Sequence, residues 1–328
     1  MSNQNWLTRI QNDPMLIDMV IPGSHDAGVY GTSLSTRKAP EAWARCQGSN
    51  IYNQAMCGSR MFDCRVFLKK DSATKSLVPT MGHFGREKKK HAGGVGSLGA
   101  YGGTLITAVN DAIAFVRTYP SEFLILRFSH TYCPGEVGIA LGDLMQKQGT
   151  LNYIYTDQDN IALCPLSQLR GKVIMVFASE FHTNFSADDG YLPFYKYSNG
   201  INVPFGLCTC GIYKGSAKMT TVHKSAATAA TDHKAHPRNH LHFVYWQQTM
   251  TGGAGDIHKS TVASNSRTLI GKKEKDYTGG AHANLGAYVD EIKANMNSGS
   301  WDLPNVISHD FVTDQTCKAI FELNPNYV

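Results

Sequence analysis

The feature that most constrains the fold is an alternation of short apolar runs with longer amphipathic segments along the chain. The runs are rich in β-branched residues and almost continuously apolar, which is typical of parallel strands buried on both faces. We predict strands over Leu16–Ile21, Met61–Phe67, Phe123–Phe128, Lys172–Ala178, His242–Trp246 and Asn305–Phe311.

Helical periodicity fills several of the intervals between these runs. Thr104–Tyr119 has apolar residues such as Leu105 and Val109 three or four positions apart, and Pro120 ends the pattern. Further helices are predicted over Glu136–Gln148, Ala281–Asn297 and Asp314–Leu323. Alternating strands and helices predict an α/β fold, and their number indicates one TIM-type (β/α) barrel domain over residues 1–328.

Composition limits the partners of the chain. No stretch approaches the roughly 20 apolar residues of a membrane helix, and the start of the chain lacks the pattern of a secretory signal. We therefore expect a soluble protein, either cytoplasmic or secreted after removal of a signal or by another route. The net charge of +5 suits weak attraction to anionic surfaces such as lipid headgroups, but not a nucleic-acid partner.

Eight cysteines are scattered along the chain without the density of a disulfide scaffold or the spacing of a zinc site. We interpret most of them as reduced core residues. The pair Cys208 and Cys210 has no interpretation from sequence.

Three segments lack periodicity, and their content of Gly, Ser and Lys predicts long loops over the barrel. They are Gly85–Gly103, Thr183–Lys218 and Gly252–Thr278. Lys88–Lys90 in the first segment is either a solvated charge run or a contact with an anionic membrane surface.

Polar residues occupy positions near the ends of predicted strands, where a barrel gathers its functional side chains. His25 and Asp26 follow the first strand, and Asp63 and Arg65 stand two residues apart on the second, so they share a face. Two further residues of this kind are His83 in TMGHFG and Asp310 in NVISHDFV.

Two histidines, two aspartates and an arginine suit phosphoryl transfer without a nucleotide. A neutral histidine can take a proton from a hydroxyl nucleophile, while a protonated one gives a proton to the leaving oxygen. An arginine fork matches two non-bridging phosphate oxygens, and a carboxylate behind a histidine favours its charged form.

The segments IPGSHDAG, GSRMFDCRV, GHFG, EFLILRFSH and NVISHDFV, in this order, resemble the X-domain signature of phosphatidylinositol-specific phospholipases C. The resemblance runs from about Ile21 to Val312. It is closest to the small single-domain members, which are bacterial enzymes, a trypanosomal glycosylphosphatidylinositol phospholipase and animal X-domain-only proteins.

The resemblance implies a distorted (β/α) barrel and a role for each residue. His25 would be the general base on the inositol 2-hydroxyl, oriented by Asp310, in a reaction that gives inositol 1,2-cyclic phosphate and diacylglycerol. His83, supported by Asp26, would be the acid, and Arg65 would stabilise the transition state. Arg60 and Asp63 would hold the end of the second strand.

The chain departs from the calcium-dependent relatives, because Arg65 stands where one of their acidic ligands would be. The resemblance therefore implies a metal-independent site, although Asp26 and Asp63 could still supply Ca²⁺ ligands. Predicted substrate contacts are Ser129, Tyr245, Gln247 and Gln248. The expected partner is a phosphatidylinositol-type lipid, bound peripherally at a membrane surface by a monomer.

Two other interpretations of the function stay open. One keeps the fold but uses Ca²⁺ on another phosphodiester headgroup, and the other is a non-catalytic inositol-lipid-binding module. A separate cluster of histidines, His223, His233, His236, His240 and His242, is interpreted as a solvated basic loop rather than a set of metal ligands.

Overall fold

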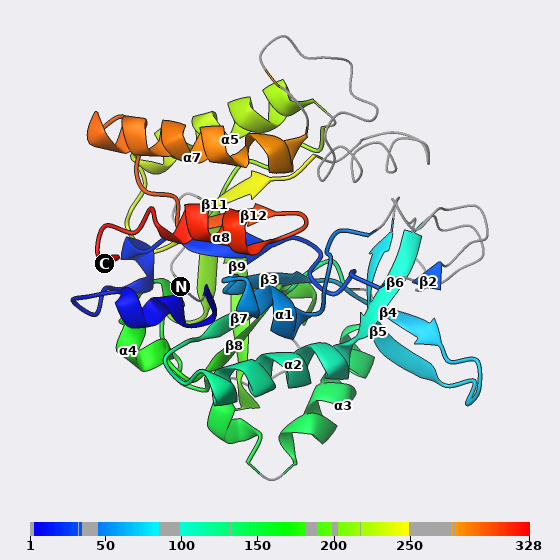
Figure 1. Ribbon diagram of the computed structural model, residues 1–328. Helices are drawn as coiled ribbons and strands as arrows, with labels where there is room; N and C mark the ends of the chain where they lie inside the picture. Colours follow the sequence, from blue (N-terminus) through cyan, green and yellow to red (C-terminus); the bar gives the residue numbers. More distant parts are fainter. Residues whose placement is uncertain are drawn as a thin grey trace.

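Eight parallel strands close into a barrel in the computed structural model of the chain (Figure 1). The structure describes residues 3–31, 33–34, 45–84, 99–131, 133–147, 149–181, 189–198, 203–216, 218–248, 277 and 280–328. The barrel strands are β1 (Ile21–Ser24), β3 (Met61–Cys64), β7 (Leu124–Phe128), β8 (Val173–Phe177), β9 (Tyr191–Lys196), β10 (Leu207–Cys210), β11 (Leu241–Trp246) and β12 (Val306–His309). Their order around the barrel is β1-β12-β11-β10-β9-β8-β7-β3, which confirms the predicted fold class.

The helices pack around this barrel. They are α1 (Ile51–Met56), α2 (Leu105–Thr118), α3 (Pro134–Met145), α4 (Leu166–Leu169), α5 (Met219–His233), α7 (Ala281–Asn297) and α8 (Asp314–Phe321). Short 3₁₀ helices cover Asn3–Arg9, Leu16–Asp18, Leu151–Tyr153, Ile161–Leu163 and Ser179–Phe181. Figure 1 shows α5 and α7 together over β11, with α2 and α3 on the side of β7 and β8. Within the described ranges, no helix has the length and apolarity needed to cross a bilayer.

A second sheet of four antiparallel strands stands beside the barrel, on the right of Figure 1. Its strands are β2 (Ser33–Leu34), β4 (Val66–Lys70), β5 (Leu77–Phe84) and β6 (Gly99–Thr104), in the order β2-β6-β5-β4. β4 begins directly after Arg65, so this sheet grows out of the chain that leaves barrel strand β3. His83 therefore comes from the added sheet rather than from a barrel strand.

Residues two positions apart on a strand face the same side of the barrel wall. On the inward side, apolar residues near the start of a strand are followed by polar residues near its carboxyl end. Met61 on β3 and Phe243 on β11 belong to the buried apolar cluster inside the barrel. Two residues further along the same strands, Asp63 and Tyr245 line a cavity. The polar residues thus gather at the carboxyl ends of the strands, where barrels carry their functional sites.

Two of the predicted strands differ from the structure. Leu16–Ile21 is wrong, because Leu16–Asp18 forms a 3₁₀ helix and the strand begins only at Ile21. The strand includes Gly23, and a larger residue would not fit there, because a Cβ would lie 2.9 Å from the Val306 side chain. Met61–Phe67 divides at Arg65, between barrel strand β3 and the separate β4.

The predicted loop Thr183–Lys218 is also wrong where the structure describes it, because it contains β9 and β10. Pro193 lies in the middle of β9, and proline is rarely found in a central strand because it cannot donate a backbone hydrogen bond. β10 has only four residues, too few for a periodic pattern. Residues 99–103 of the predicted loop Gly85–Gly103 belong to β6. Residues 85–98, with Lys88–Lys90, and nearly all of Gly252–Thr278 lie outside the described residues.

The other predicted elements agree with the structure to within a few residues. α7 covers the predicted Ala281–Asn297, and α2, α3 and α8 lie within or near their predicted ranges. All eight cysteines are free thiols, of which six are buried, as the composition indicated.

Candidate active site at the barrel mouth

The turn after β1 brings two of the predicted residues to the mouth of the barrel. The backbone N–H of His25 donates to the carbonyl of His309, and the Gln47 side chain donates to the carbonyl of His25 at 2.8 Å. Asp26 has a φ of 43°, in the left-handed region that non-glycine residues rarely adopt. Its buried side chain is thereby directed toward the neighbouring strand ends.

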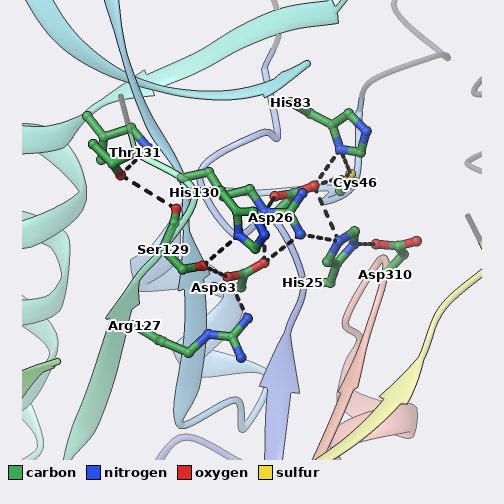
Figure 2. Close-up of polar contacts among 12 residues, drawn as sticks. His25, Asp26, Cys46, Asp63, His83, Arg127, Ser129, His130, Thr131 and Asp310 are labelled. Carbon is green, nitrogen blue, oxygen red and sulfur yellow. Dashed lines mark hydrogen bonds and ion pairs between the residues drawn. The ribbon is translucent and has the colours of Figure 1, made fainter. Parts of the chain in front are cut away.

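His25 makes polar contacts through both ring nitrogens (Figure 2). Its Nδ1 lies 2.7 Å from Asp310 Oδ1, and its Nε2 lies 3.1 Å from Arg65 Nη2. Because a guanidinium can only donate, the neutral imidazole that satisfies both contacts carries its proton on Nδ1. The lone pair of Nε2 therefore faces the Arg65 guanidinium.

His83 lies on the other side of Asp26, as Figure 2 shows. Its Nδ1 is hydrogen-bonded to Asp26 Oδ2, and the Cys46 sulfur lies 3.4 Å from the same nitrogen. The His25 and His83 rings are 6.2 Å apart, centroid to centroid. One carboxylate thus stands between two histidines, each of which presents a different nitrogen to it.

Arg65 joins the two strand-end carboxylates. Its Nε lies 2.8 Å from Asp26 Oδ1, and its Nη2 lies 3.1 Å from Asp63 Oδ2. Asp63 is also paired with Arg127 at 2.7 Å and accepts a hydrogen bond from Ser129. We call His25, Asp26, Asp63, Arg65, His83 and Asp310 the barrel-mouth cluster.

The charges of this cluster shift the pKa values of its members. Burial disfavours charge on His25, but the carboxylates of Asp26 and Asp310 outweigh it and raise the pKa of His25 above 6.5. Burial alone would raise the pKa of Asp26, yet Arg65 and the two histidines hold this pKa below its ordinary value. Arg127 and Arg65 likewise overcome burial and lower the pKa of Asp63.

A cavity of about 450 Å³ opens over this cluster. Its wall includes the predicted residues His25, Asp63, Arg65, Ser129, Tyr245 and Gln247. Residues at this wall that the sequence prediction did not assign to the site are Arg127, His130, Ala178, Ser179, Phe194, Tyr195, Lys196, Tyr213 and Ser308. The cavity therefore combines aromatic faces with several cationic groups.

Two predicted site residues lie elsewhere. Arg60 precedes β3 at the amino end of the strand, opposite the mouth, where it forms a fully buried ion pair with Glu122. It anchors the start of the strand rather than its end. Gln248 is buried, and its side-chain oxygen accepts a hydrogen bond from the backbone of Ala281 at 3.0 Å, so it braces α7 and does not face the cavity.

The carboxylates considered as calcium ligands are engaged by the protein itself. Arg65 contacts both Asp26 and Asp63, so a Ca²⁺ ion would have to displace the guanidinium from between them. Calcium takes six to eight oxygen ligands. This pair of carboxylates does not provide an open set of that kind.

Comparison with solved structures identifies proteins with a similar barrel. The structure superposes on the phosphatidylinositol-specific phospholipase C of Listeria monocytogenes with a TM-score of 0.62 over 98% of both chains, at 17% identity. A Staphylococcus aureus variant of such an enzyme gives 0.58, with 97% of this chain and 96% of that chain covered, at 14% identity. The fold is therefore the barrel of the bacterial phosphatidylinositol-specific phospholipases C.

Local sequence matches point the same way. A PI-PLC X domain-containing protein of Dictyostelium discoideum is 38% identical over 79 residues, 19% of this chain and 14% of that protein. A 1-phosphatidylinositol phosphodiesterase of Staphylococcus aureus is 26% identical over 133 residues, 40% of this chain and 35% of that protein. The matches thus span about a third or less of these relatives, and no family model matches the chain. Together with the fold, they confirm the resemblance to the phosphatidylinositol-specific phospholipase C X-domain family.

Proposed function

We propose that this chain cleaves the phosphodiester of phosphatidylinositol, or of its glycosylated anchor form, to diacylglycerol and inositol 1,2-cyclic phosphate. The observation that carries the proposal is His25. Its Nδ1 contacts Asp310, while its Nε2 lies beside Arg65 at the wall of the cavity. A base and a cationic phosphate ligand thus share one opening.

In this proposal, His25 Nε2 takes the proton of the inositol 2-hydroxyl as that oxygen attacks phosphorus. Arg65 donates to the non-bridging oxygens as negative charge builds on them. The P–O bond to diacylglycerol breaks, and His83 gives the departing oxygen a proton. Asp310 and Asp26 support the histidines by fixing their orientation and stabilising their charged forms.

The wall of the cavity suits an inositol headgroup. Ser129, Tyr245 and Gln247 carry hydroxyl and amide groups that can bind ring hydroxyls, and we propose them as substrate contacts. Lys196 and Arg127 add positive charge for the phosphate. We also propose that the reaction needs no metal ion, because Arg65 already supplies the cation between Asp26 and Asp63. The protein would meet its lipid by binding peripherally at a membrane surface.

The test is hydrolysis of phosphatidylinositol vesicles, with and without excess EGTA, followed by phosphorus NMR of the soluble products. We expect cyclic inositol phosphate in both samples and none with a His25→Ala variant. Loss of the product with EGTA alone would overturn the metal-independent mechanism. No product in either sample would overturn the choice of substrate and leave another phosphodiester headgroup or lipid binding without cleavage.

A further inference from the structure

Three histidines of the histidine-rich segment are buried, which contradicts its interpretation as a solvated loop. His233 ends helix α5, and His240 and His242 lie at the start of β11. Their side chains are within the protein, with 5%, 0% and 0% of their surface exposed. Cys210, at the end of β10, lies beside His242 in the parallel pairing of the two strands. We call Cys210, His233, His236, His240 and His242 the outer-wall cluster.

This cluster is separated from the candidate active site by the barrel wall. Tyr245 on β11 faces the cavity, and side chains alternate along a strand, so His242 points to the opposite face. Its neighbours Val244 and Trp246 pack against α5 and α7 on that outer face. The outer-wall cluster therefore lies on the face of β11 that packs against α5, the helix that Figure 1 shows over this strand.

The ring faces of these histidines are packed against other aromatic rings, but several of their ring nitrogens have no hydrogen-bond partner among the described residues. His233 stacks on His242 at 4.9 Å, and Tyr197 stacks on His240 at 4.0 Å. Among the described residues, His242 Nδ1 and Nε2, His233 Nε2 and His240 Nε2 have no hydrogen-bond partner. His233 Nδ1 is 3.7 Å from Asp302, beyond hydrogen-bonding distance. Buried polar atoms without partners are rare, because each costs about 1–3 kcal/mol.

The geometry points to a zinc-class metal site formed by Cys210, His233 and His240. One ligand atom from each of these residues lies within 4.8 Å of the others. Tetrahedral zinc with ligands at about 2.0–2.3 Å brings such atoms to about 3.3–3.8 Å apart, so small side-chain rotations suffice. Water or His236 would complete the fourth position. Thiolate and imidazole together favour zinc over calcium or magnesium.

The surroundings of the ligands fit such an ion. His240 Nδ1 contacts the Asn239 side-chain oxygen at 2.9 Å, which leaves the lone pair of Nε2 for the metal. The carbonyl end of α5, at His233, also favours a cation. A separate cavity of about 530 Å³ reaches His233 and Asp302 from outside and offers an access route.

Metal binding would release one proton. The ligand form of cysteine is the thiolate, so the S–H bond of Cys210 breaks and its proton passes to solvent as the metal–sulfur bond forms. Affinity should therefore fall as pH decreases. The ion would join β10, β11 and the end of α5, which makes its role structural and independent of phosphodiester cleavage.

The test measures zinc content and affinity in the full chain after removal of metal with a chelator. We expect one tight Zn²⁺ equivalent per chain, lost in Cys210→Ser and His240→Gln. The matched control is Cys208→Ser, two residues away on the same strand face, which should bind normally. Asn239→Ala should weaken binding about 10- to 100-fold, because it removes only the group that orients His240.

A second group of possible ligands, His25, Asp26 and Cys46, belongs to the candidate active site. Loss of zinc in Cys46→Ser, with binding retained in Cys210→Ser, would overturn the proposal. X-ray absorption of the unmodified zinc-loaded chain removes any dependence on variants that fold poorly. We expect one sulfur at about 2.3 Å and nitrogens at about 2.0 Å. A spectrum without sulfur, or no tight zinc equivalent, would equally refute the site.

Discussion

At the barrel mouth, His25 makes polar contacts through both ring nitrogens, whereas outside the barrel wall neither ring nitrogen of His242 has a partner among the described residues. Both rings are buried. The pKa of His25 is raised because carboxylates surround it, while burial lowers the pKa of His242 to about 3. Burial alone therefore does not determine how a histidine behaves, because its charged neighbours decide the sign of the shift.

The difference indicates two kinds of site. In the barrel-mouth cluster, protein charges already balance one another, and the side chains are held in place before any substrate arrives. In the outer-wall cluster, ligand atoms of Cys210, His233 and His240 lie close together, and several buried ring nitrogens have no hydrogen-bond partner among the described residues. In the functions proposed here, the first site catalyses phosphodiester cleavage and the second binds a metal ion. Four experiments separate these descriptions, beginning with the largest expected effect.

Removing either histidine of the mouth should be the most damaging change to activity. His25→Ala and His83→Ala should each lower kcat at least roughly 10³-fold, because each removes one proton-transfer step. The measurement is release of water-soluble inositol phosphate from phosphatidylinositol vesicles, with circular dichroism to check folding. His223→Ala is the control, since His223 pairs with Glu291 in a partly exposed contact and does not line the cavity. A near-wild-type rate in either mouth variant would contradict the acid–base assignment.

Replacing Arg65 by lysine should have the next largest effect. Arg65→Lys keeps the charge but loses the planar fork that contacts Asp26 and Asp63 together, so kcat should fall about 10²-fold. Arg238→Lys is a matched control, because Arg238 forms an exposed pair with Asp18. The comparison uses the same vesicle assay. An unimpaired Arg65→Lys variant would argue against contact between this side chain and phosphate.

The pH profile tests whether the mouth carboxylates control His25. A general base must be neutral, and the pKa of His25 is raised, so kcat/KM should rise with pH until pH passes that raised value. Asp310→Asn removes one carboxylate that raises this pKa, so the rising limb should move to lower pH. A one-proton limb changes the rate by at most about tenfold per pH unit. Asp290→Asn, at an exposed helix position, should leave the limb in place. An unmoved limb in Asp310→Asn would assign it to another group.

The sequence predicted the barrel-mouth cluster better than its surroundings, for a physical reason. His25, Asp63 and Arg65 interrupt apolar strand patterns, and strand ends converge in a barrel, so their meeting could be predicted. Cys46 lies outside any periodic pattern and reaches His83 only through the path of a loop. The pairing of Arg127 with Asp63 depends on the register of two strands distant in sequence.

The outer-wall cluster shows the opposite limit. Histidine is a polar residue, and a polar residue in a sequence does not indicate a core position. His240 and His242 were therefore interpreted as part of a solvated loop, although both are fully buried. The alternation of His242, Val244 and Trp246 was the available signal, because these residues face the same side of β11. Cys210 and His233 approach them only after β10 and α5 have packed, and no local pattern predicts that packing.

The smallest effect, and the sharpest contrast between the two sites, is expected from His242→Phe in chelator-treated protein. The ring of phenylalanine keeps the stacking on His233 but lacks the two buried nitrogens that have no partner among the described residues. The free energy of unfolding should therefore rise by about 1–2 kcal/mol. His309→Phe is the matched control, because His309 is also buried but its Nε2 contacts Thr316 at 2.9 Å, and its loss should destabilise. Urea midpoints at constant m give both values. If His242→Phe destabilised the protein as much as His309→Phe, the His242 nitrogens would have partners after all, and the contrast between the two sites would fail.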